Sequence, residues 1–278
     1  VDHGSPLDVV DMAQMMSDDG IKRALIQVCN SYYYRMPGKE KEAAELEGVV
    51  QRLREMGYVV SRYDEYRECA QKDDTVSVYD QMHTEAFPEY CLHRENGELQ
   101  RGWYPKYLMN PVLSLELATK KIHQNIKRYP YSGRFIDCVG TCTMWEAEDW
   151  NPEHPCDTYD TKRARKGLLE LVNSLGLVVG TEGAVDYLVP NLHWIETPMS
   201  LAKWTVIGLP IPGYAPANDF PEYQISIGTK YRIPFYSLVH HSEVLITWRY
   251  EESPQRMLQY WQDKNLWSVL YGNPLLFF

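Results

Sequence analysis

The chain has 278 residues, which is long enough to bury the core of one large α/β domain without a disulfide framework or a structural metal. Its net charge of −10 disfavours nucleic acids and anionic membrane surfaces as partners, because both bind basic surfaces. No apolar run reaches the roughly 18 residues of a membrane span, and the first residues, Val1 to Pro6, lack the basic start and apolar stretch expected of a signal peptide. The six cysteines form no CxxC pair, so free thiols and a reducing, cytoplasmic compartment are favoured.

Apolar runs alternate with amphipathic helices along the first two thirds of the chain, as in proteins with a parallel sheet. The apolar spacing predicts helices over residues 5–19, 40–56, 110–128 and 161–175. Short runs rich in β-branched residues predict strands over residues 23–29, 58–63, 134–139 and 177–181.

Two regions depart from this alternation. Residues 90–99 contain Asn96-Gly97, a strong hairpin signal, and we interpret them as a hairpin inserted after a strand, over one mouth of a barrel. The last third is rich in proline and loops, and there we expect a strand over 234–239 and a helix over 254–263.

This order predicts an α/β protein, a (β/α)8 TIM-type barrel with six or seven of its strands in this chain. The chain starts on a helix and stops on an apolar run, so we expect a barrel incomplete at its N-terminal strand. Residues 1–278 would then be one catalytic barrel domain, excised from a longer protein.

Carboxylates stand at the expected ends of four strands: Asp64, Asp137, Glu182 and Glu243. Active sites of such barrels lie at the carboxyl ends of the strands. Glycoside hydrolysis needs two carboxyl groups, about 5–5.5 Å apart in retaining enzymes, and neighbouring strands lie about 4.8 Å apart. We therefore assign Asp137 as nucleophile and Glu182 as acid/base. The alternative for each is a helix cap or an ion pair.

Further side chains near these strand ends are candidates for substrate contact, with packing as the alternative reading, above all for Trp248. They are Tyr63, Asp64, Trp145, Asp186, His240, His241, Glu243 and Trp248. The two adjacent histidines lack the spacing of HxH or HExxH sites, so we expect neither a metal nor another cofactor.

Two segments carry a family resemblance: FIDCVGTCTMWEAEDWNPEHP and LGLVVGTEGAVDYLVP. Over residues 58–278 the chain resembles the endo-α-N-acetylgalactosaminidases and α-N-acetylgalactosaminidases of glycoside hydrolase families 101 and 129, and their uncharacterised bacterial relatives. The resemblance implies a retaining mechanism with Asp137 of FIDCVG as nucleophile and Glu182 of GTEG as acid/base. It also implies a galactose- or N-acetylgalactosamine-type substrate.

We therefore expect a retaining glycoside hydrolase that cleaves an α-linked glycoside by double displacement. The main alternative is a carbohydrate-binding barrel without catalysis, because a fold does not determine a function. A metal-assisted hydrolase that uses His240 or His241 is a weaker alternative. In the first two cases the partner is a carbohydrate, not a nucleic acid or a membrane.

Overall fold

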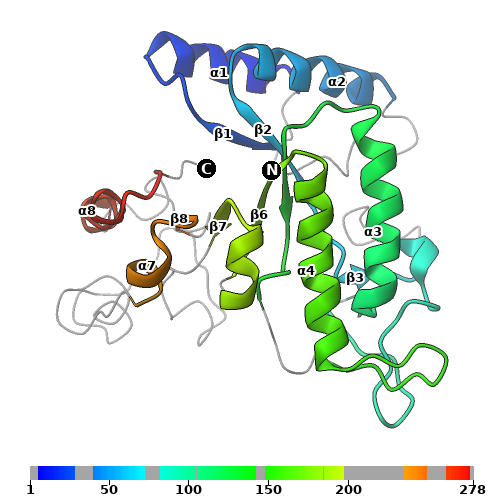
Figure 1. The fold of residues 1–278 in the computed structure, drawn as a ribbon. Coiled ribbons are helices and arrows are strands. Elements are labelled where there is room, and N and C mark those ends of the chain that lie inside the picture. The colour runs from blue at the N-terminus through cyan, green and yellow to red at the C-terminus, as the bar shows by residue number, and fades with distance from the viewer. Residues whose placement is uncertain are drawn as a thin grey trace. The chain divides into compact units, whose positions relative to one another are not determined.

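The computed structural model describes residues 6–28, 40–72, 82–103, 105–141, 148–183, 185–196, 235–248 and 261–275. The chain divides into two compact units, Val1–Val179 and Gly180–Phe278. Each unit is built on parallel strands joined through helices (Figure 1).

The sheet of the first unit is parallel. Its strands are β1 (Leu25–Val28), β2 (Val59–Asp64) and β5 (Gly133–Ile136), in that order. Strand β6 (Val178–Glu182) begins in this unit beside β5, where the Val178 N–H donates to the Ser132 carbonyl at 2.9 Å. The carboxyl ends of β2 and β5 therefore meet at one edge of the sheet.

Four helices pack on this sheet: α1 (Asp8–Asp18), α2 (Glu40–Glu55), α3 (Pro111–Ile126) and α4 (Thr158–Ser174). Helices α1 and α2 share a buried core with β1 and β2, in which Val49, Leu53 and Val60 are at most 1% exposed. Helices α3 and α4 lie side by side (Figure 1). Their starts are capped: Asn110 accepts from the backbone N–H groups of α3, and Asp157 forms a capping box on α4.

Between β2 and α3 lie the short strands β3 (Glu68–Cys69) and β4 (Tyr107–Leu108), which pair antiparallel, and the 3-10 helix η3 (Thr84–Ala86). Near the expected hairpin, His93 and Leu99 form an isolated antiparallel bridge, and the turn between them holds Gly97 at φ +81°. No strand is assigned to residues 90–99, so the expected hairpin is present only as a bridged turn.

The second unit has its own parallel strands. The end of β6 pairs with β7 (Trp194–Glu196), which pairs with β8 (Leu245–Thr247). Helical segments are η5 (Asp186–Asn191), α7 (Phe235–His240) and α8 (Trp261–Tyr271).

The strand expected over 234–239 is wrong, because this segment forms helix α7. A run of six residues is too short for its apolar spacing to separate a strand from a single turn and a half of helix. The correction moves Glu243 from the end of a strand to the connection before β8, at the amino end of that strand. The helix expected over 254–263 lies mostly outside the described residues, and α8 begins at Trp261.

The expected α/β class is confirmed. The described residues contribute six parallel strands: β1, β2, β5, β6, β7 and β8. The four helices and the four strands predicted in the first two thirds of the chain all lie within a few residues of their predicted bounds. No helix in the described ranges has the length and apolarity needed to cross a membrane.

Candidate active site

Asp137 is positioned by the ends of two neighbouring strands. It follows β5 directly, and its backbone N–H donates to the Asp64 carbonyl at the end of β2 at 2.8 Å. Its carboxylate Oδ2 accepts a hydrogen bond of 2.5 Å from the Tyr63 hydroxyl. The Tyr63 ring stacks on Phe135, its register partner in β5, with centroids 6.0 Å apart. Side chains alternate along a strand, so Tyr63, Phe135 and Asp137 lie on one face of the sheet.

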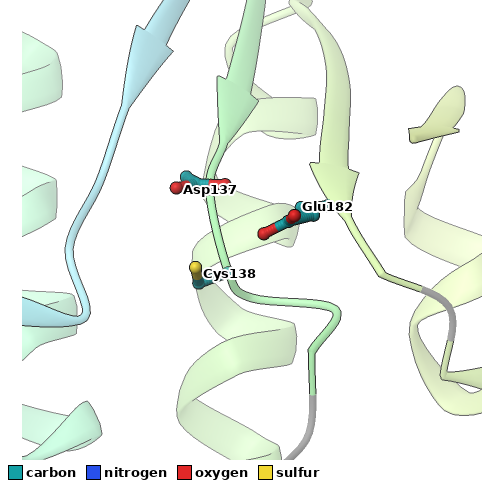
Figure 2. Close-up of side chains that lie close together, drawn as sticks. All are labelled: Asp137, Cys138 and Glu182. Atoms are coloured by element: carbon teal, nitrogen blue, oxygen red, sulfur yellow. The ribbon is translucent and has the colours of Figure 1, made fainter. Parts of the chain in front are cut away.

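The chain turns sharply after Asp137 (Figure 2). Cys138 has φ +59°, in the left-handed region that residues with a Cβ seldom adopt, and the Thr141 hydroxyl donates to its carbonyl at 2.8 Å. This turn ends β5 at the nucleophile candidate and directs the chain into the loop toward α4.

Glu182 is the last residue of β6, as Figure 2 also shows. Its register partner in β7 is Glu196, and the Gly183 N–H donates to the Glu196 carbonyl at 2.9 Å. Gly183 has φ +87°, a conformation that glycine adopts without a steric penalty. Each of the two candidate carboxylates thus stands at the carboxyl end of a parallel strand of its own unit.

Glu65, which was not predicted from the sequence, lies close enough to Asp137 to feel its charge. It is 4% exposed, and its Oε1 accepts from the backbone N–H of Glu68 at 2.9 Å and from that of Arg67. Burial raises its pKa to about 8, and the negative charges of Glu68 and Asp137 add to this effect against the opposing charge of Lys106. The sequence RYDEY could have identified Glu65 as a candidate, because this carboxylate directly follows the end of a strand.

Glu68 holds an exposed tryptophan in place. Its buried carboxylate accepts from the Arg67 guanidinium at 2.9 Å and from the Trp103 backbone N–H at 2.6 Å, and lies 3.4 Å from Lys106 Nζ. Trp103 itself is 71% exposed. A Cβ at Gly102 would meet the Glu68 carboxylate, so a larger residue there would require the Glu68 side chain to shift.

Asp149 fixes the described part of the loop between Asp137 and α4. Its Oδ1 accepts from the backbone N–H groups of His93 and Asn151 at 2.9 and 3.0 Å. Its Oδ2 accepts from the Asn110 side chain at 2.7 Å and contacts Nδ1 of His154 at 2.8 Å. Because Asn110 also caps α3, this buried carboxylate joins the loop to the start of that helix.

Asp64 is placed differently from the expected substrate contact. Its carboxylate is buried and accepts from Arg62 Nε at 2.7 Å and from the Arg134 guanidinium. Arg134 also donates to Asn125 Oδ1 of α3 at 2.6 Å. The Asp64 carboxylate therefore pairs with two buried arginine side chains, which disfavours the expected substrate contact.

Three of the remaining candidates meet in the second unit. Nδ1 of His240 lies 2.9 Å from Glu243 Oε2, and its Nε2 lies 3.3 Å from Asp186 Oδ1. His241 instead donates from Nδ1 to the Ser237 carbonyl within α7 at 3.0 Å. The two histidines do not alternate along a strand, since both lie at the end of a helix.

The tryptophan candidates separate by burial. Trp248 is buried against α8, where its indole N–H donates to Ser268 Oγ at 3.1 Å and Lys264 Nζ lies 4.6 Å from its ring centroid. This arrangement favours packing, the alternative reading for that residue. Trp145 lies outside the described residues.

A protein-family match covers both candidate carboxylates, Asp137 and Glu182. The family model for glycosyl hydrolases related to the GH101 family, GH129, matches residues 38–205. A comparison with curated proteins returned no match.

Solved structures show a similar fold. The α-N-acetylgalactosaminidase NagBb from Bifidobacterium bifidum, in complex with GalNAc, has a TM-score of 0.70 at 15% identity over 98% of this chain and 41% of that chain. A quadruple mutant of NagBb has a TM-score of 0.71 at 14% identity, with the same coverage. The maltogenic α-amylase AmyB from Thermotoga neapolitana has a TM-score of 0.51 at 14% identity over 87% of this chain and 54% of that chain. The chain thus spans about two fifths of the length of NagBb.

Proposed function

Because the chain belongs to the glycosyl hydrolases related to the GH101 family, GH129, we propose that it hydrolyses an α-linked glycoside with retention of configuration. The observation that carries this proposal is the position of two carboxylates. Asp137 and Glu182 both stand at the carboxyl ends of parallel strands, within the residues that the family model matches. This is where barrel enzymes hold their reacting groups.

In the first step, a carboxylate oxygen of Asp137 attacks the anomeric carbon while the bond to the leaving oxygen breaks. Glu182 in its acid form gives its proton to that oxygen. In the second step, Glu182 takes a proton from water, the water oxygen attacks the anomeric carbon, and the Asp137 carboxylate leaves. The product keeps the starting configuration because each step inverts it once.

We further propose a galactose- or N-acetylgalactosamine-type sugar as the residue released. The similarity in fold to NagBb over nearly all of this chain supports this choice. We also propose that the parallel strands belong to a (β/α)8 barrel within a longer protein, which the length of NagBb relative to this chain supports.

The test is nitrophenol release from aryl α- and β-glycosides of galactose, N-acetylgalactosamine and glucose. Wild type is compared with Asp137→Ala, with Glu182→Ala and with Glu170→Ala, a control at an exposed helix position. We expect both site variants to lose activity and the control to retain it. Added azide should give a glycosyl azide of the substrate's configuration from Glu182→Ala and of the opposite configuration from Asp137→Ala.

A folded wild type that releases nothing from the whole panel would overturn the proposed activity. If it then binds the same sugars, as titration calorimetry would show, the carbohydrate-binding alternative is favoured. Retained activity in either site variant would remove that residue from the assigned pair.

A further inference from the structure

The end of β2 holds Asp137 through two separate contacts. The Asp64 carbonyl accepts the Asp137 backbone N–H at 2.8 Å, and the Tyr63 hydroxyl donates to Oδ2 of the side chain at 2.5 Å. Stacking on Phe135 fixes the Tyr63 ring in turn. The carboxylate therefore cannot rotate without breaking the Tyr63 hydrogen bond, and its other oxygen, Oδ1, is the atom that we assign to attack.

The surroundings of Asp137 make this hydrogen bond important. The nearby Glu65 is buried, and burial raises its pKa to about 8, which favours its uncharged form at neutral pH and reduces its repulsion of the Asp137 charge. In the described part of the chain, Tyr63 is the side chain that donates to the Asp137 carboxylate. A hydrogen bond to a carboxylate strengthens as the negative charge on its oxygens grows.

The charge on Asp137 changes in opposite directions in the two steps of the proposed function, on which this inference rests. It falls when Asp137 bonds to the sugar and returns when the sugar leaves. The geometry points to Tyr63 as a positioning residue that stabilises Asp137 as the leaving group of the second step. Its hydrogen bond should accelerate release of the sugar from Asp137 without accelerating the attack that forms the bond.

The test is Tyr63→Phe, which keeps the ring against Phe135 and removes only the hydroxyl. The assay uses the dinitrophenyl form of whichever glycoside wild type cleaves, so that the first step is fast. We expect kcat to fall about 10- to 100-fold, the size of a hydrogen bond to a charged group. KM should fall in the same proportion and kcat/KM should stay within about threefold, because the second step alone is slowed. A burst of dinitrophenol equal to the enzyme concentration should precede the slow phase.

The matched control is Tyr58→Phe, which also removes a buried tyrosine hydroxyl in the segment that enters β2. That hydroxyl donates to the Ile21 carbonyl at 2.6 Å and lies 3.3 Å from the Ala13 carbonyl, and both partners lie outside β2 and β5. We expect its kcat and KM to stay within about twofold of wild type. The same kinetic change in both variants would assign the effect to packing and overturn the inference.

The remaining outcomes separate this inference from the proposed function. Unchanged kcat and KM in Tyr63→Phe, or an equal fall in kcat and kcat/KM without a burst, would overturn the role of Tyr63 while the glycosidase activity stands. A wild type that cleaves no glycoside overturns the proposed function itself, and this inference falls with it.

Discussion

The carboxylate of Asp64 and the guanidinium of Arg62 form a buried ion pair of 2.7 Å, in which each side chain is 1% exposed. Arg134 pairs with the other carboxylate oxygen and also reaches Asn125 of α3. One negative charge thus lies between two positive ones in the core of the first unit. These ion pairs join β2 to β5 next to Asp137. The position of Asp137 therefore depends on buried charges on the opposite face of the sheet.

Asp64→Asn should destabilise the protein strongly. The substitution keeps the shape of the side chain but leaves two buried guanidinium groups without their counter-charge, which costs about 3–5 kcal/mol. The control is Glu170→Gln, which removes a carboxylate from the exposed Lys166–Glu170 pair of 3.0 Å and should change stability by less than about 0.5 kcal/mol. Urea unfolding measures both; similar changes in the two variants would contradict the prediction.

Glu65 should make stability depend on pH. Its folded pKa of about 8 lies above the ordinary value of 4.5, so the folded state holds this proton more tightly than the unfolded state. The contribution is fully present below pH 4.5 and is lost progressively as the pH rises to about 8. We expect the free energy of unfolding of wild type to decline relative to Glu65→Gln across this range. If the difference in free energy of unfolding between wild type and Glu65→Gln stays constant from pH 4.5 to 8, the raised pKa of Glu65 is refuted. The control is Glu47→Gln, at an exposed position, for which we expect a constant difference.

Gly180→Ala should disrupt the second unit. A Cβ at Gly180 would lie 2.0 Å from the Trp194 ring, where β6 and β7 pair, so the buried ring would have to shift. Overpacking of this kind costs about 1–3 kcal/mol or more. The matched control is Gly48→Ala in α2, where a Cβ meets nothing within 4 Å and the better helix propensity should stabilise by about 0.5–1 kcal/mol. Thermal unfolding decides: a Gly180→Ala protein as stable as wild type would show that the strands are not packed as described.

His154 should be the Nδ1–H tautomer. Its Nδ1 faces the Asp149 carboxylate at 2.8 Å, which can only accept. Its Nε2 lies 2.8 Å from the side-chain nitrogen of Asn151. The amide oxygen of Asn151 already accepts a hydrogen bond from the Glu153 backbone N–H, which fixes the orientation of the amide. The Asn151 nitrogen therefore donates to Nε2, and Nε2 accepts. Long-range ¹H–¹⁵N NMR of labelled protein should show a hydrogen on Nδ1 alone, with His154→Gln used to assign the signal. A hydrogen on Nε2 would mean that the Asp149 network is arranged differently.

Much of the first unit could be predicted from local sequence. The helices are long enough to show helical spacing, as in α2, where five buried apolar residues recur over 16 residues, and β2 and β5 alternate along the chain with such helices. The same reasoning placed Asp137 and Glu182 at strand ends, because a charged residue that closes an apolar run marks the edge of the sheet. In α7, six residues carried too little periodic signal, and the strands β7 and β8, three residues each, carried less.

The neighbours of each side chain were decided only by the tertiary structure. Asp64 and Asp137 both close strands and look alike in the sequence, yet one binds two buried arginines and the other accepts from Tyr63. The difference arises from the register of β2 against β5, which sets Arg62 beside Arg134 on one face of the sheet and Tyr63 beside Phe135 on the other. Local spacing reports which residues are buried, but the register between strands far apart in the chain decides which charges meet, and the free energies that set this register come from packing across the whole unit.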